Sequence, residues 1–250
     1  MKLSAVIITL NEERNLPRCL ESLREVADEI VVVDSFSTDG TRSIAEQMGA
    51  RFIEHRFEGH IQQKNFALTC ASHEWILSLD ADEALDETLR ASIMIIKNNG
   101  NAMGYSMNRL TNYCGKWVRH CGWYPDTKVR LIRAGAGTWQ GVNPHDRLDL
   151  TGGVQPTHLK GDILHYSYYT LDDHRKQIEY FGDIAAHELF VQGKTISPIM
   201  IYFKVIAQFI KSFFLKLGIL DGFTGWTISR MSAFATWRKY RKLINLHSNT

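Results

Sequence analysis

The first hundred residues alternate short apolar runs with segments whose apolar residues recur every three or four positions. The apolar runs predict buried strands at Ser4–Thr9, Ile30–Val33, Arg51–His55 and Trp75–Leu79. The segments between them predict helices, the first with Leu16, Leu20 and Leu23 on one face. Four strand-helix units in succession predict an α/β fold with a mostly parallel central sheet and helices on both faces.

Polar residues stand where helices should begin. Asn11 is the expected cap of the first helix, and Ser37 or Thr38 that of the second. Asp86 is the expected cap of the fourth helix, which should end at Asn98-Asn99-Gly100.

The pattern changes after Gly100. Two further strands are predicted, followed by an amphipathic helix, a strongly apolar helix and a basic, aromatic helix: Gly104–Leu110, Lys128–Arg133, Leu171–Val191, Ile196–Leu220 and Trp226–Leu246. We therefore expect one domain over residues 1–192 and a helical tail over residues 193–250.

Charge separates the tail from the body. The 250-residue chain is 44% hydrophobic, enough to bury a core, and carries a net charge of +2. From Lys194 onward, nine Lys or Arg residues face one acid, Asp221, which leaves 20 basic and 26 acidic residues before it. The tail is basic and the body mildly acidic.

Four cysteines without CxxC spacing do not suggest a disulfide framework or a zinc site, so a reducing cytosol is expected. The N-terminal apolar run spans only about six residues, which is too short for a signal peptide.

Chemistry concentrates where the predicted strands end. Open parallel sheets bind ligands outside the carboxyl ends of their strands, which here selects Thr9-Leu10-Asn11-Glu12, the segment from Asp34 to Gly40, and the acids Asp80, Asp82 and Glu83. The simpler alternative for Asp34 and Asp39 is that they cap the next helix.

No glycine-rich phosphate loop follows any of these strands: GxGxxG and GxxxxGK[ST] are both missing. Crowded carboxylates are costly unless a cation compensates them. An acidic site of this kind holds phosphates through a metal ion, so Asp80-x-Asp82 predicts Mn²⁺ or Mg²⁺ bound together with a diphosphate.

Four ordered motifs resemble the family 2 inverting glycosyltransferases, which have the GT-A fold: AVIITLNEERNLPRCLESL, EIVVVDSFSTDGT, Gln63-Lys64-Asn65 and WILSLDADE. The resemblance covers roughly residues 3–150. With NPHDRL, ILHYSY and LGILDGFTGW included, the pattern looks most like bacterial lipopolysaccharide glucosyltransferases that act on inner-core heptose.

The resemblance implies a role for each matching residue. Residues 1–100 would form the nucleotide-sugar half of the domain and residues 101–192 the acceptor half. The donor, with UDP-glucose the first candidate, would contact Thr9, Asn11, Glu12, Asp34, Lys64 and Asp80. Asp82 would bind the metal, and His165 in ILHYSY would contact the metal or the diphosphate. For His165 the alternative is a packed core histidine.

An inverting transfer also needs a general base for the acceptor hydroxyl, and the resemblance points to Asp146 in NPHDRL. The alternative is a loop salt bridge from Asp146 to Arg147. Trp123, Asp126 and Arg130 would border the acceptor, since aromatic rings pack on sugars and Arg suits phosphate. Arg130 could instead pair only with Asp126.

The tail helix Ile196–Leu220 is long enough to span a bilayer, but central residues such as Lys204 and Lys211 are costly there. We expect it to lie in the interface on the cytoplasmic face of the inner membrane, helped by the basic stretch Trp237–Lys242. The alternative is packing on the catalytic domain or on another subunit.

Three rival functions are weaker. A sugar-phosphate nucleotidylyltransferase would need a GxGTR-like loop, which is missing. A catalytically silent, membrane-associated nucleotide-sugar-binding protein would be expected to lose an acid at Asp34, Asp82 or Asp146, and all three are present. Nucleic-acid binding by the tail fits poorly with so apolar a helix.

Overall fold

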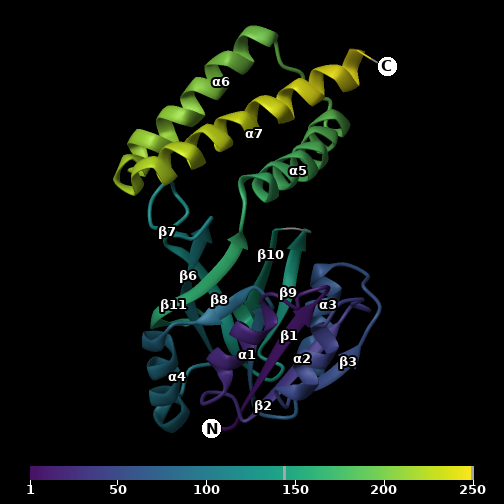
Figure 1. The fold of residues 1–250 in the computed structure, drawn as a ribbon, viewed down its shortest axis with the longest axis vertical. Coiled ribbons are helices and arrows are strands. Elements are labelled where there is room, and N and C mark those ends of the chain that lie inside the picture. The colour runs from purple at the N-terminus through teal and green to yellow at the C-terminus, as the bar shows by residue number, and fades with distance from the viewer. Residues whose placement is uncertain (143–144, 249–250) are drawn as a thin grey trace. The chain divides into compact units, whose positions relative to one another are not determined.

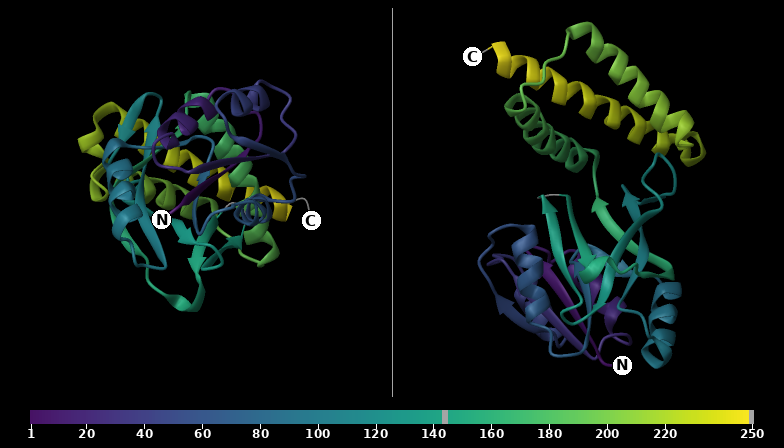
Figure 2. Two further views of the ribbon diagram at one scale, coloured as in Figure 1. Left: turned by 90° about the horizontal axis from the view of Figure 1, so that it is seen from below. Right: turned by 180° about the vertical axis from the view of Figure 1, so that it is seen from behind.

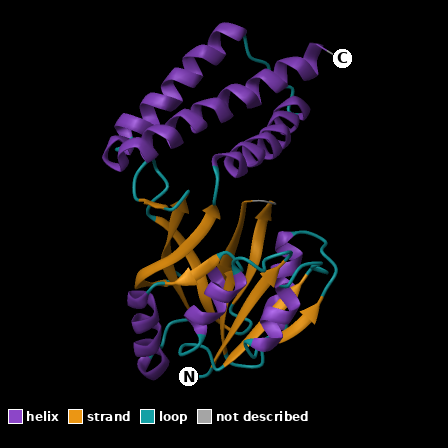
Figure 3. Ribbon diagram, viewed as in Figure 1, coloured by secondary structure: helices purple, strands orange, loops and turns teal. Residues whose placement is uncertain are grey.

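The structure is a computed structural model that describes residues 1–142 and 145–248. Figure 1 shows the order of its elements, and Figure 3 colours the helices and strands. The N-terminal elements are β1 (Leu3–Thr9), α1 (Leu16–Leu23), β2 (Glu29–Asp34), α2 (Thr41–Gln47), β3 (Arg51–Glu54), α3 (His60–Thr69), β4 (Trp75–Asp80), β5 (Glu83–Leu85) and α4 (Glu87–Asn99). The later elements are β6 (Gly104–Tyr113), β7 (Lys116–Val118), β8 (Asp126–Arg133), β9 (Gly137–Val142), β10 (His145–Leu150), β11 (Thr157–Tyr168), α5 (Leu171–Val191), α6 (Pro198–Ile210) and α7 (Gly222–Ser248).

The central sheet has the strand order β3-β2-β1-β4-β8-β6-β11-β5. Its first four strands are parallel, which confirms the predicted strand-helix units. Beyond β4 the pairs of β8 with β4 and with β6, and of β11 with β5, are antiparallel. The α/β prediction is confirmed, with a parallel half that carries the predicted donor residues Thr9, Asp34 and Asp80.

Strand β1 is apolar because both faces of the sheet are covered. Leu3, Ala5 and Ile7 pack in one core cluster with residues of α1 and α4. Val6 lies in a second cluster, which contains residues of α3 and of the β9–β10 hairpin. Alternate side chains of a strand point to opposite faces, so β1 packs against helices on both faces of the sheet.

Two of the predicted helix caps are wrong. The first helix begins at Leu16, and Asn11 instead adopts a left-handed φ of 55°. The second helix begins at Thr41 after Gly40, because Ser37 and Thr38 form hydrogen bonds within the loops that follow β1 and β2. The predicted cap Asp86 is confirmed: its side chain accepts a hydrogen bond from the Leu89 N–H.

The chain forms two compact units, residues 1–109 with 126–166 and residues 110–125 with 167–250. In the second unit α5 and α6 each pack against α7, as two views in Figure 2 also show. The predicted domain boundary after residue 192 remains a prediction. The predicted helix Ile196–Leu220 is in fact α6, a π-helical turn at Lys211–Leu215 and a short 3₁₀ turn, because Leu217 adopts a left-handed φ of 55°.

Candidate active site

The ends of three parallel strands meet at one edge of the sheet in the first unit. In the strand register Thr9 lies beside Asp34, and Ile8 lies beside Asp80. The predicted donor and metal residues after β1, β2 and β4 are therefore neighbours in space.

Asp34 is a buried carboxylate that joins two of these strand ends. Its Oδ1 accepts hydrogen bonds from Thr9 Oγ1 at 2.8 Å and from Ser37 Oγ at 2.5 Å, and its Oδ2 accepts one from the Ser37 N–H at 2.7 Å. Only 1% of Asp34 is exposed. The alternative that Asp34 caps α2 is wrong, since the residue fixes the loop after β2.

Asn11 and Glu12 hold the loop after β1 against the loop after β2. Asn11 Oδ1 accepts a hydrogen bond from the Thr38 N–H at 2.8 Å, and the Glu12 N–H donates to Thr41 Oγ1 at 2.8 Å. Burial raises the pKa of Glu12, and the nearby carboxylate of Asp82 raises it further. Carboxylates from the ends of β1 and β4 therefore lie close enough to influence one another at this edge of the sheet.

Asp82 and His165 come together from two elements. His165 lies on β11, in register with Glu83, and its Nε2 is 3.2 Å from Asp82 Oδ2. Burial acts to raise the pKa of Asp82, but His165 more than offsets it and the pKa is lowered. Within residues 1–142 and 145–248, no group of three or more His, Cys, Asp or Glu side chains could by itself hold a metal ion.

Glu83 and Arg130 form a buried ion pair beneath the site. Arg130 Nη2 is 2.7 Å from Glu83 Oε1 and 3.3 Å from Asp80 Oδ2, while the Glu83 side chain has no exposed surface. Burial lowers the pKa of Arg130, yet Glu83 and Asp80 raise it by more, so its pKa lies above the ordinary value. The alternative of an Arg130–Asp126 pair is wrong, because Asp126 pairs with Arg109 at 2.8 Å and Lys128 at 2.9 Å.

Lys64 contacts both Asp80, at the end of β4, and Asp146, the predicted base. Its Nζ is 2.7 Å from Asp146 Oδ2 and 3.0 Å from Asp80 Oδ1, and it lies 4.3 Å from the centre of the Trp139 ring. Burial would raise the pKa of Asp80, but Lys64 and Arg130 together lower it. An Asp146–Arg147 salt bridge is not what forms, since Arg147 pairs with Asp149 at 2.7 Å.

The residues on either side of Lys64 fix its helix in place. Gln63 Nε2 donates to Ser35 Oγ at 3.1 Å, which ties α3 to the end of β2. The Asn65 side chain donates to the carbonyl oxygen of Trp139 and accepts from its N–H, both at 2.9 Å. The Gln63-Lys64-Asn65 motif therefore connects β2, the site and the β9–β10 hairpin that carries Asp146.

A cavity of about 500 Å³ opens between these groups in the first unit. Its charged lining residues are Lys64, Asp80, Arg109, Lys128, Arg130, Asp146, Arg147 and Asp149. Asn143 and Pro144, from the NPHDRL motif, lie outside the described residues.

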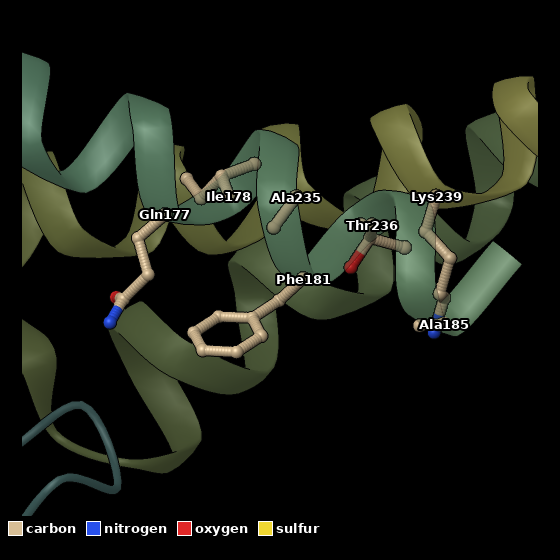
Figure 4. Close-up of a pocket in the computed structure, with 8 residues that line it drawn as sticks. Gln177, Ile178, Phe181, Ala185, Ala235, Thr236 and Lys239 are labelled. Carbon is tan, nitrogen blue, oxygen red and sulfur yellow. The ribbon is translucent and has the colours of Figure 1, made fainter. Parts of the chain in front are cut away.

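Trp123, the third predicted acceptor residue, belongs to the second unit. There its ring packs against Tyr113 and Tyr168, with both centroids 5.7 Å away. A further cavity of about 290 Å³ in that unit lies between α5 and α7 (Figure 4). Since no carboxylate, histidine or cysteine lines it, this cavity lacks the ligands of a metal site.

The site also contains charged and aromatic residues that the motifs did not assign. Glu83 belongs to the acidic run after β4, and its complete burial is the signal of a paired charge. Arg109 lies 3.5 Å from Glu83. The ring of Trp139 packs against the charged groups of both Lys64 and Arg130. Arg109 is the only charged residue in the predicted strand Gly104–Leu110, which could have indicated a paired charge. No feature of the sequence singled out Trp139.

Sequence comparison decides the family. Residues 4–136, more than half of the chain, match the family described as "Glycosyl transferase family 2". The chain belongs to glycosyltransferase family 2. This assignment confirms the resemblance seen in the motifs and makes the protein a glycosyltransferase.

The relatives that match nearly the whole chain include one from Rickettsia and one from Rhizobium. An uncharacterized glycosyltransferase of Rickettsia bellii is 32% identical, over 98% of this chain and 87% of the relative. The lipopolysaccharide core biosynthesis glycosyltransferase LpsC of Rhizobium meliloti is 28% identical, over 96% of this chain and 93% of its own.

Among solved structures, one similar chain is the glucosyl-3-phosphoglycerate synthase of Mycobacterium tuberculosis, crystallised with Mn²⁺, UDP and glucosyl-3-phosphoglycerate. It is 21% identical, with a TM-score of 0.38, and the match covers 44% of each chain.

Proposed function

We propose that this family 2 enzyme is a metal-dependent, inverting hexosyltransferase that moves glucose from UDP-glucose to the lipopolysaccharide core or another lipid-linked glycan. The observation that carries the proposal is the Lys64 ammonium between Asp80, on the predicted donor side, and Asp146, the predicted base. A single lysine that contacts both carboxylates brings the predicted donor contact and the predicted proton acceptor to one place, as transfer of a sugar from donor to acceptor requires.

The donor set suits a metal that arrives with a diphosphate. Mg²⁺ is commonly held by one or two carboxylates together with substrate phosphates rather than by an all-protein cage. Asp82 would supply the carboxylate, His165 would stand beside it, and Asp80 would contact the ribose or a metal-bound water. When bound, the metal would neutralise charge on the leaving diphosphate.

The nucleotide would lie along the ends of β1 and β2. Thr9, Asn11, Glu12 and Asp34 would line its pocket, and the hydrogen bonds between these two loops support a preformed shape. Lys64 would face the donor phosphates.

Asp146 would act as the general base. Its carboxylate would take the proton of the acceptor hydroxyl while that oxygen forms the new bond to the anomeric carbon. The bond from that carbon to the diphosphate oxygen breaks, and the electron pair leaves with the nucleotide. Attack from the opposite face inverts the configuration, and the 2.7 Å contact with Lys64 would orient the carboxylate.

The acceptor class rests on the likeness to LpsC, whose name places it in lipopolysaccharide core biosynthesis. Asp126 and Arg130 of the first unit would border this acceptor, and the acceptor role of Trp123 stays a prediction from the sequence. With such a substrate the enzyme would work at the cytoplasmic face of the inner membrane.

Calorimetric titration of UDP-glucose tests the donor and the metal together. We expect binding in Mn²⁺ that is lost in EDTA and in Asp82→Ala, with the fold of the variant intact by circular dichroism. Binding that persists without metal would contradict the assignment of Asp82, and binding of another nucleotide sugar alone would contradict the choice of glucose.

Asp146→Asn tests the base separately. We expect donor binding to remain and transfer to fall by at least about a hundredfold. Asp172→Asn is the matched control, because Asp172 lies on α5 of the second unit with its side chain 75% exposed and does not line this cavity. Near wild-type turnover in Asp146→Asn would place the base elsewhere.

A further inference from the structure

Helix α6 in the second unit turns its most apolar side outward. The window Pro198–Leu215 has a mean hydropathy of 1.4, and length and composition would let it cross a membrane, yet only 11% of it is buried. Core helices of soluble proteins with this composition are buried. The outward side of α6 therefore requires a partner.

The side of α6 and of the π-helical turn after it that meets α7 is narrow and partly polar. Ile201 of α6 and Ser212 of the turn are its buried residues, and Ser212 Oγ accepts a hydrogen bond from Ser229 Oγ of α7 at 3.0 Å. At about 100° per residue, the large apolar residues of α6 and the turn fall on the opposite side: Ile199, Phe203, Ile206, Ile210 and Phe214. Each of these five is exposed.

The turn from α6 to α7 continues this apolar surface. Leu215 is 73% exposed and Phe223 is 80% exposed, and Leu217, Ile219 and Leu220 between them are exposed as well. We call the outward side of α6 together with residues 215–223 the apolar face. An exposed run of this size marks an interaction site.

We propose that the apolar face docks into an anionic lipid surface, with α6 lying in the plane of the membrane. Charge supports a lipid occupant: the exposed lysines Lys204, Lys211 and Lys216 flank the apolar side chains, and no acid lies between Lys194 and Leu220. An apolar side bordered by lysines suits the boundary between headgroups and acyl chains. The contact of α6 with α7 along its other side favours a surface position over a spanning one.

The structure also separates this face from the basic end of the tail. Arg238 and Lys242 of α7 each lie 3.4 Å from Asp183 of α5, so they pair inside the unit. The inference deepens the proposed function, since it rests on a lipid-linked acceptor and names the surface that would hold the enzyme near it.

Flotation with vesicles tests the inference on the full chain. One vesicle sample contains phosphatidylethanolamine and phosphatidylglycerol, and the other contains only phosphatidylcholine. We expect the protein to bind the anionic vesicles, and Phe203→Gln/Phe223→Gln to lower the affinity at least about tenfold. Lys204→Gln/Lys211→Gln should weaken binding and reduce its dependence on salt. Ile95→Gln on α4, 65% exposed, is the matched control that should bind as wild type does.

Failure of the inference is distinguishable from failure of the proposed function. If wild type stays unbound, or if Phe203→Gln/Phe223→Gln binds as tightly as wild type, the inference is overturned. Self-association in sedimentation without vesicle binding would mean that a second copy covers the face, which also overturns it. Donor titration of the same variants reports separately on the active site and should be unchanged.

Discussion

Arg130→Met isolates the buried ion pair beneath the site. Methionine keeps much of the apolar volume of the side chain but removes the guanidinium that contacts Glu83 at 2.7 Å. Breaking one partner out of a buried pair costs about 3–5 kcal/mol. Glu83 would still have Arg109 at 3.5 Å and the Asp80 N–H at 3.0 Å, so we expect the lower end, about 3 kcal/mol.

Urea unfolding followed by circular dichroism measures this loss, and thermal unfolding should show a fall of about 6–12 °C. Glu83→Gln and the double variant complete a thermodynamic cycle. Because Gln removes the charge that Arg130 compensates, the double variant should lose less than the two single losses together, by at least about 1 kcal/mol.

The control is Arg42→Met, which removes an exposed pair with Glu46 on α2 and should cost less than about 1 kcal/mol. A loss below about 1 kcal/mol in Arg130→Met, or additive losses in the cycle, would refute the view that Glu83 depends on Arg130.

Three further outcomes are expected. Burial would raise the pKa of Glu29, but hydrogen bonds from Ser4 and Ser72 and the charge of Arg51 lower it from 4.5 to about 2. The free energy of unfolding of the wild type should therefore fall by on the order of 3 kcal/mol as the pH falls from 4.5 to about 2. Urea titrations of Glu29→Gln should lack this dependence. Burial lowers the pKa of His174 from 6.5 to about 4, so the second unit should lose stability as pH falls through that range, and a flat profile in wild type, or an unchanged one in His174→Gln, would contradict this. Asn65→Leu removes both hydrogen bonds to Trp139 and should cost about 1–3 kcal/mol and lower turnover more than donor affinity, measured by unfolding and by calorimetry.

The parallel half of the fold could be predicted because its signals are local. A strand buried on both faces is apolar throughout, and β1, β2 and β4 were found within one residue of their ends. The strand-end rule then brought Asp34 and Asp80 to one edge of the sheet without knowledge of any contact.

Side-chain partners could not be predicted, because they depend on segments far apart in the sequence. Arg130 meets Glu83 across a separation of 47 residues, and Lys64 meets Asp146 across 82. The sequence offered only local partners as alternatives, Asp126 for Arg130 and Arg147 for Asp146, and neither pair forms. The prediction of Asn11 as a helix cap was wrong for a related reason, because its side chain accepts a hydrogen bond from the loop after β2 instead of from its own helix.

The two hydrogen bonds of Asn65 involve only main-chain atoms of residue 139. Any residue other than proline at that position offers the same N–H and carbonyl, so these two hydrogen bonds do not depend on the side chain at position 139. The Trp139 ring and Leu148 add a second, side-chain anchor in the core. A change at position 139 should therefore weaken the packing of the hairpin while leaving its main-chain register on α3 intact.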